Sequence, residues 1–234
     1  MYLPTLDLTL KPTSWLDTKI LPYDRRLVNL KLETMPNLDL SKSERTQERI
    51  LEAATKEFAA FGIAGGRVDR IAKAAKANKS LIYDYFGSKE QLFRAVLERH
   101  LIDVYRTVHF NAEDLPGYAI GLFDFAMDHP DLMRLVMWNG LEQRPEWPLD
   151  DMSSLATQVE EVRKAQAKNS VSNAYPPDFL LTLIITLASA WTAANPFGMS
   201  ITPDAGKRRT SLKTALSNAV RQLCELQEYE KVGT

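Results

Sequence analysis

The sequence is poor in features that mark secreted proteins. Its single cysteine, Cys224, cannot form an internal disulfide, which fits a reducing compartment. The first thirty residues hold three prolines and scattered acids, where a secretory signal would have a basic start followed by an apolar run. From these absences we expect a cytoplasmic protein.

Long hydrophobic runs are also missing. The most apolar stretch, residues 179–194, has sixteen residues and is interrupted by four hydroxyl side chains. A membrane-spanning helix needs about 20 apolar residues. We therefore expect no membrane span, and we interpret the stretch as a helix buried in a core or between subunits.

Signatures of enzymes and metal sites are absent as well. The sequence has no glycine-rich phosphate loop and no nucleophile elbow. Its three histidines, His100, His109 and His129, lack the spacing of a metal-ligand set. We expect no enzymatic activity, no cofactor and no metal.

Charge is nearly balanced overall but unevenly distributed. A net charge of −1 and a pI of about 6.3 argue against a uniformly basic protein that coats nucleic acid. Residues 41–100, however, contain twelve Lys and Arg against eight Asp and Glu, so this segment carries +4 and the remainder −5. Within it, "RVDRIAKAAKANK" (residues 67–79) has a basic residue at every third position.

One continuous helix cannot gather that basic row on one side. A step of three residues rotates by about 300°, so the five side chains would spread over about 240°. Two short helices that meet near Lys76 explain the row better. Ile71, Ala75 and Ile82 have the spacing to fill the corner between them, and Ala72 is small where they touch.

Hydrophobic periodicity predicts helices almost everywhere from residue 41 onward, hence an all-α fold. We expect a first helix that ends at Gly62, then the two short helices, the second capped by Asn78. A long helix capped by Ser88 should follow to about residue 108, and then about five more helices, the last over about 207–229. Residues 1–40 contain four prolines. We interpret them as a flexible or weakly docked extension, with two short strands as the alternative.

The motifs of residues 44–98 resemble the amino-terminal DNA-binding domain of the TetR family of transcriptional regulators. The resemblance is carried by "IA" at 71–72, "YDYF" at 83–86 and "SKE" at 88–90, in the family's order and spacing. It implies a three-helix, helix-turn-helix domain over about 41–90. It also implies a larger helical domain over 91–234 that binds a ligand and dimerises.

The resemblance further implies that the helix beginning at Asn78 enters the major groove of DNA. The DNA-binding candidates, which would read bases or hold phosphates, are Thr46, Arg67, Lys76, Asn78, Lys79, Ser80, Tyr83 and Lys89. Three positions depart from the family pattern. Lys76 replaces the usual turn glycine, Gly66 stands where a threonine often caps the next helix, and Asp84 replaces a frequent histidine.

The family pattern also implies partners. One helix-turn-helix makes few base contacts, so we expect a homodimer on a double-stranded DNA operator, joined through about 178–194 and 207–229. A small apolar or aromatic effector would bind among the later helices. Candidate ligand-binding residues, each also consistent with an ordinary core position, are Tyr105, His109, Phe125, Met137, Trp138 and Trp191.

The function that these expectations describe is a ligand-responsive transcriptional regulator. We favour a repressor that binds a near-palindromic operator and is released by its effector, although activation stays open. The alternative is an all-helical ligand carrier or interaction protein in which the motif is only structural. The departures at Lys76, Gly66 and Asp84 keep that alternative open.

Overall fold

The computed structural model describes residues 42–142 and 153–225, and their regular secondary structure is helical throughout. The all-α fold expected from the sequence is therefore confirmed. The expectations for residues 1–40 lie outside the described residues. Within the described ranges, no helix has both the length and the apolar character needed to cross a membrane.

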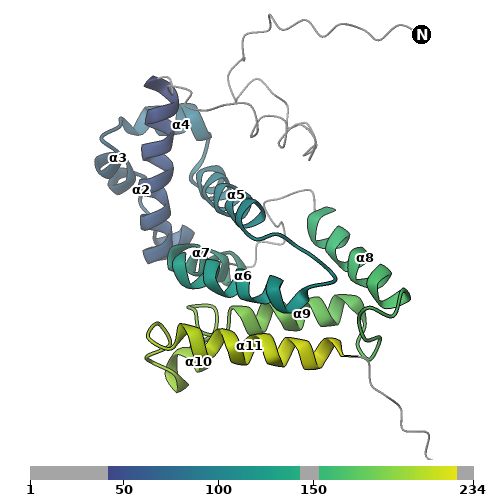
Figure 1. Cartoon of the computed structure of the whole chain (residues 1–234). Helices are drawn as coiled ribbons and strands as arrows, with labels where there is room; N and C mark the ends of the chain where they lie inside the picture. Colours follow the sequence, from purple (N-terminus) through teal and green to yellow (C-terminus); the bar gives the residue numbers. More distant parts are fainter. Residues whose placement is uncertain (1–41, 143–152, 226–234) are drawn as a thin grey trace, which may run out of the picture. The chain divides into compact units, whose positions relative to one another are not determined.

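Ten helices follow one another along the described residues (Figure 1). Their bounds are α2 Lys42–Gly65, α3 Val68–Ala75, α4 Lys79–Phe86, α5 Lys89–Thr107, α6 Leu115–Asp128, α7 Pro130–Leu141, α8 Ser153–Ala167, α9 Pro177–Ala188, α10 Pro196–Ile201 and α11 Arg209–Cys224.

Polar side chains fix the starts of the helices near the predicted DNA surface. The Asn78 carboxamide oxygen accepts a hydrogen bond from the Ser80 amide at 3.0 Å and begins α4. The Ser88 hydroxyl accepts from the Gln91 amide at 3.1 Å and begins α5. Both caps were predicted from the sequence.

The hydrophobic core is continuous from α2 to α11. In its first part α2 packs against α3 and α5, where the buried rings of Phe58 and Phe93 meet edge to face at 5.4 Å. In its last part α6 packs against α9 and α11. The helices α2 and α7 also pack against each other, so the two parts share one interface.

The predicted helix over 178–194 was too long. The regular helix α9 ends at Ala188, and turns lead to α10. The Ser189 hydroxyl donates to the Ile185 carbonyl at 2.9 Å, and the Thr192 hydroxyl donates to the Ser189 carbonyl at 2.7 Å. Hydroxyl groups that compete for backbone carbonyls in this way favour the end of a helix.

The last helix also differs from the expectation. It begins at Arg209 and ends at Cys224, where 207–229 was predicted. Part of the predicted range, residues 226–229, lies outside the described residues. The described residues after Asn111 form six helices instead of about five, because Pro196 starts the short helix α10.

Candidate nucleic-acid interface

The helices α3 and α4 meet in a tight turn at Lys76. This residue adopts the left-handed conformation, with φ 51° and ψ 44°, and caps the end of α3. The Ala77 amide donates to the Ala72 carbonyl at 3.0 Å and closes the turn. A residue other than glycine costs about 1 kcal/mol here, which the packing of the corner must offset.

An apolar corner holds the two short helices at a fixed angle. Ile71, Ala75 and Ile82 are each at most 2 % exposed, and Ala77 and Tyr85 pack against them. This is the corner predicted from the sequence. It leaves the outer face of α4 to solvent.

That outer face carries the residues predicted to reach DNA. Asn78, Lys79, Ser80 and Tyr83 are all exposed, and so is Asp84. The Asn78 side chain uses only its oxygen for capping, so its amide nitrogen is available as a donor. Together they form one surface at the start of α4, which has the size and shape to enter a major groove.

Lys79 already has an anionic neighbour on this surface. Its Nζ lies 2.9 Å from Asp69 Oδ1 on α3, and both side chains are about half exposed, at 49% and 61%. The hydrogen bond with Lys79 lowers the pKa of Asp69, and the same bond raises the pKa of Lys79. An exposed pair of this kind is weak, so a DNA phosphate can replace the carboxylate.

The remaining predicted residues surround the corner. The Thr46 hydroxyl donates to the Lys42 carbonyl at 2.9 Å and accepts from Arg49. Lys76 is exposed at the turn. The Nζ of Lys89 lies 3.4 Å from the Gly66 carbonyl, which places its ammonium group beside the start of α3.

Gly66 does not cap α3, contrary to the expectation from the sequence. The cap position belongs to Arg67, whose side chain is exposed and makes no capping bond. The Arg67 amide instead donates to Glu57 Oε1 at 2.8 Å. Gly66 is needed for space, because a Cβ there would lie 2.7 Å from the Phe58 ring.

Arg70 stabilises the connection between α2 and α3. Its guanidinium pairs with the buried carboxylate of Glu57, with Nε 2.7 Å from Oε1, and donates to the Gly65 carbonyl at 3.1 Å. It also lies over the Phe61 ring, 4.3 Å from the centroid. Sequence reasoning missed Glu57, since nothing in the local pattern separates it from the exposed acids of the same helix.

The helix α2 is broken at Gly62, and α7 completes its hydrogen bonds. Gly62 has φ 68° and ψ −176°, which removes the Ile63 and Ala64 amides from the regular helical pattern. Glu142 Oε1 accepts from both amides, at 2.8 Å and 3.0 Å. A carboxylate from the end of α7 therefore holds the segment that leads into the helix-turn-helix.

The break in α2 leaves the Ala59 carbonyl without its helical hydrogen bond, and two further side chains of α7 donate to it. Ala59 O accepts from Arg134 Nε at 2.7 Å and from Trp138 Nε1 at 3.2 Å. The Trp138 ring covers Gly62 so closely that a Cβ there would lie 2.8 Å from it. We call Arg134, Trp138 and Glu142, which follow one another at intervals of one helical turn, the α7 clamp.

The residues predicted to bind a ligand do not share one cavity. Met137 and Trp138 line a hollow of about 160 Å³. Phe125 is buried and stacks on His129 at 3.9 Å, and Trp191 meets the Phe123 ring edge to face at 5.8 Å. His109 is exposed, and Tyr105 is half-buried.

A helix-turn-helix with an exposed recognition helix, followed by a larger set of packed helices, defines a class of DNA-binding transcriptional regulators. Residues 50–96 match the family model of bacterial regulatory proteins of the tetR family. Residues 114–222 match the model of the Tetracyclin repressor-like C-terminal domain.

Known transcriptional regulators are similar to this chain in sequence and in structure. The HTH-type transcriptional repressor SCO4008 of Streptomyces coelicolor is 37% identical over 186 residues, which are 78% of this chain and 96% of that protein. The repressor NicS of Pseudomonas putida is 36% identical over 110 residues, 44% of this chain and 51% of its own. The crystal structure of the transcriptional regulator SCO4942 of S. coelicolor superposes with a TM-score of 0.69 at 36% identity, covering 76% of this chain and 98% of that one.

The chain belongs to the TetR family of transcriptional regulators. It is a DNA-binding regulator and not an enzyme, because this family acts by binding operators and not by catalysis. Regulators of this family typically work as homodimers.

Proposed function

We propose that the protein is a ligand-responsive repressor that binds a near-palindromic operator as a homodimer in the cytoplasm and releases it when an effector binds. The observation that carries the proposal is the exposed polar face at the start of α4 on a rigid apolar corner. The similarity to a named repressor along 96% of that protein's length supports repression over activation.

On this proposal the outer face of α4 reads the operator. Asn78, Lys79 and Ser80 approach base edges in the major groove, where an amide or ammonium group can distinguish bases. Tyr83 donates its phenol to a phosphate, and Lys89 adds a cation beside the start of α3. Arg67, Lys76 and Thr46 add phosphate contacts at the margins.

The homodimer that we propose uses α9 and α11. Both helices pack one face on α6 and leave another face to solvent. On α9 the exposed face includes Phe179, Thr182 and Thr186. Two half-sites on successive turns of one DNA groove require two copies of α4 about 34 Å apart, and in this proposal the pairing of these faces with those of a second copy sets that distance.

Effector binding would act through the relative position of the two recognition helices. A ligand that binds better to a dimer with the wrong spacing shifts the population towards that dimer and releases DNA. The α7 clamp supplies a physical connection, because it joins the later helices to the end of α2.

The test is selection of genomic fragments by the purified protein at physiological salt. We expect salt-sensitive, nanomolar-range binding to a fragment with a near-palindrome. Lys79→Ala and Tyr83→Ala should each lose most of this binding while folding and dimerising normally, whereas Arg163→Ala, at an exposed cation of α8 outside both proposed surfaces, should keep it. No preference over random DNA would refute the proposal.

A further inference from the structure

A buried polar pair connects α6 with α8. The Tyr118 hydroxyl donates a hydrogen bond to Gln158 Oε1 at 3.2 Å, and both residues are only 7% exposed. Burial and the neighbouring Tyr105 raise the pKa of Tyr118 to about 12, although the bond to Gln158 lowers it slightly. The phenol is therefore neutral at every physiological pH.

This pair is incompletely satisfied. The Gln158 side-chain nitrogen makes no hydrogen bond with any described residue, whereas the buried hydroxyls of Ser172 and Thr192 both have partners. A buried amide that is left unpaired loses its hydrogen bonds to water and gains none in return, which destabilises the folded protein. Because buried polar groups are nearly always paired, the free N–H groups of Gln158 indicate a missing partner that accepts hydrogen bonds.

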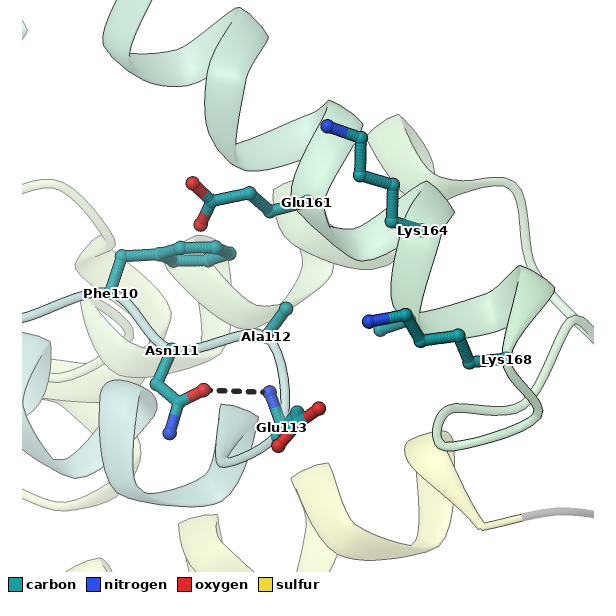
Figure 2. Close-up of a pocket in the computed structure, with 8 residues that line it drawn as sticks. Phe110, Asn111, Ala112, Glu113, Glu161, Lys164 and Lys168 are labelled. Carbon is teal, nitrogen blue, oxygen red and sulfur yellow. Dashed lines mark hydrogen bonds between the residues drawn. The ribbon is translucent and has the colours of Figure 1, made fainter.

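A hollow of about 250 Å³ lies between residues 110–113 and α8 (Figure 2), and one of its lining residues, Phe110, contacts Tyr118. The Phe110 ring stands in this hollow opposite Glu161, and it meets the Tyr118 ring edge to face with the centroids 4.9 Å apart. Glu161 and Ala165, which line the hollow, follow Gln158 on the same face of α8. The Phe110 ring therefore both lines the hollow and contacts the buried pair.

The charge around the pair restricts what can bind. Among the described residues from Leu115 onward, no Asp, Glu, Lys or Arg side chain is buried. An anionic ligand group placed beside Tyr118 and Gln158 would lose its hydration without gaining an opposite charge, which is costly. A cationic group could pair with Glu161, which is half-buried in the hollow, but it would offer no acceptor to the Gln158 N–H groups. Lys164 and Lys168 also line the hollow, but both are exposed, so solvent screens their charges (Figure 2).

We propose that Tyr118 and Gln158 bind the effector, and that the effector inserts an uncharged, planar group with a carbonyl oxygen between α6 and α8. The Gln158 N–H groups donate to that oxygen, and the Tyr118 oxygen accepts from any N–H group beside it. Rotation of the Phe110 ring opens the hollow to the pair. This inference rests on the proposed function, since it names the chemical class of its effector.

The test uses three probes of one shape and different charge: neutral benzamide, anionic benzoate and cationic benzamidine. Each is titrated by calorimetry into the full-length protein. A one-ring probe should bind only in the millimolar range. We expect benzamide to bind at least about tenfold more tightly than either charged probe, since benzoate would enter with an unpaired charge and benzamidine has no acceptor for the Gln158 N–H groups.

A double variant separates a binding role from a structural one. Tyr118→Phe with Gln158→Met replaces both partners by apolar groups of similar shape, which is expected to leave the melting temperature unchanged or higher. The same variant should lose benzamide binding by about tenfold or more. Gln166→Met is the matched control: its amide donates to the Ser172 and Tyr175 carbonyls, so it should lower the melting temperature and keep benzamide binding.

Three outcomes would overturn the inference: equal affinity for the three probes, no saturable binding of benzamide, or a double variant that melts earlier yet binds benzamide normally. Operator binding is measured on the same samples without a probe. A protein that binds its operator but ignores benzamide contradicts this inference alone, whereas one that binds no operator contradicts the proposed function.

Discussion

At the scale of single residues, Asp69 is an acid placed to limit DNA binding through its pair with Lys79. It holds Lys79 at 2.9 Å on the face proposed to enter the groove. Asp69→Asn removes one negative charge from that face and frees the ammonium group. We expect operator affinity to rise several-fold, with a steeper dependence on salt, because one more cation is available to phosphates.

Fluorescence anisotropy with labelled operator DNA, at two salt concentrations, measures this effect. Lys79→Ala in the Asp69→Asn background should remove the gain in affinity. A gain that survives without Lys79 would show that Asp69 acts by general repulsion of DNA and not through the pair.

His100 makes the stability of the protein depend on pH. Its Nε2 lies 3.2 Å from the Thr55 hydroxyl, between α5 and α2, and burial lowers the pKa of the ring. The unfolded chain therefore takes up a proton near pH 6.5 that the folded chain resists. The contribution of neutral His100 is present above that pH and is lost as the pH falls below it.

We expect the melting temperature of the wild type to fall as the pH is lowered from 7 towards 5. His100→Gln keeps a group that can bond to Thr55 and cannot titrate, so its decline should be shallower. Thermal melts of both proteins across this range provide the measurement, with His109→Gln, at an exposed histidine, as the control. Parallel curves for all three would contradict the assignment.

The sequence predicted residues whose role is set by near neighbours. Asn78 and Ser88 cap helices within three positions of themselves, and Lys76 adopts the left-handed turn conformation that the helix-turn-helix spacing demanded. Glu57 and Glu142 could not be predicted, because their partners are ten or more residues away in the chain. Such contacts depend on how the helices pack and leave no local pattern.

At the scale of elements, the break in α2 could be predicted from the sequence, but the distant residues that stabilise it could not. Gly62 was correctly predicted to end the regular helix, since glycine favours the positive φ found there. The acceptors and donors that replace the lost helical bonds all come from α7, 75 to 79 residues further along. Only the folded structure reveals that the α7 clamp supports the helix-turn-helix.

Glu142→Gln tests the clamp. The amide oxygen can still accept a hydrogen bond, but the charge that strengthens both bonds is lost, so we expect unfolding stability to fall by about 1–2 kcal/mol. Operator affinity should fall further than stability explains, because α3 follows directly from the clamped segment. Urea denaturation and anisotropy, measured on the same preparation, give the two quantities.

Glu52→Gln, at an exposed acid of α2, is the control and should change stability by less than about 0.5 kcal/mol. If Glu142→Gln lowers stability but leaves operator affinity unchanged, the clamp supports the fold without positioning the DNA-binding helices.

At the scale of the whole molecule, the family resemblance of residues 44–98 led to the fold class and the kind of function, and both are confirmed. The later helices carried no comparable motif. Among their aromatic residues Phe125 is buried and Trp191 is half-buried against the core, and helical spacing alone cannot distinguish such positions from the lining of a pocket. The division at about residue 90 stays a prediction.

The homodimer is the prediction on which operator recognition depends. Thr186 is exposed on α9, where the proposed interface leaves no room for a long charged side chain. We expect Thr186→Arg to shift the protein from dimer to monomer in light scattering and to weaken operator binding by about 100-fold or more, because each half-site alone offers few contacts. Thr157→Arg, at an exposed threonine of α8, should remain dimeric and bind normally. A dimeric Thr186→Arg with full affinity would place the interface elsewhere, whereas a monomer with full affinity would refute dimeric recognition itself.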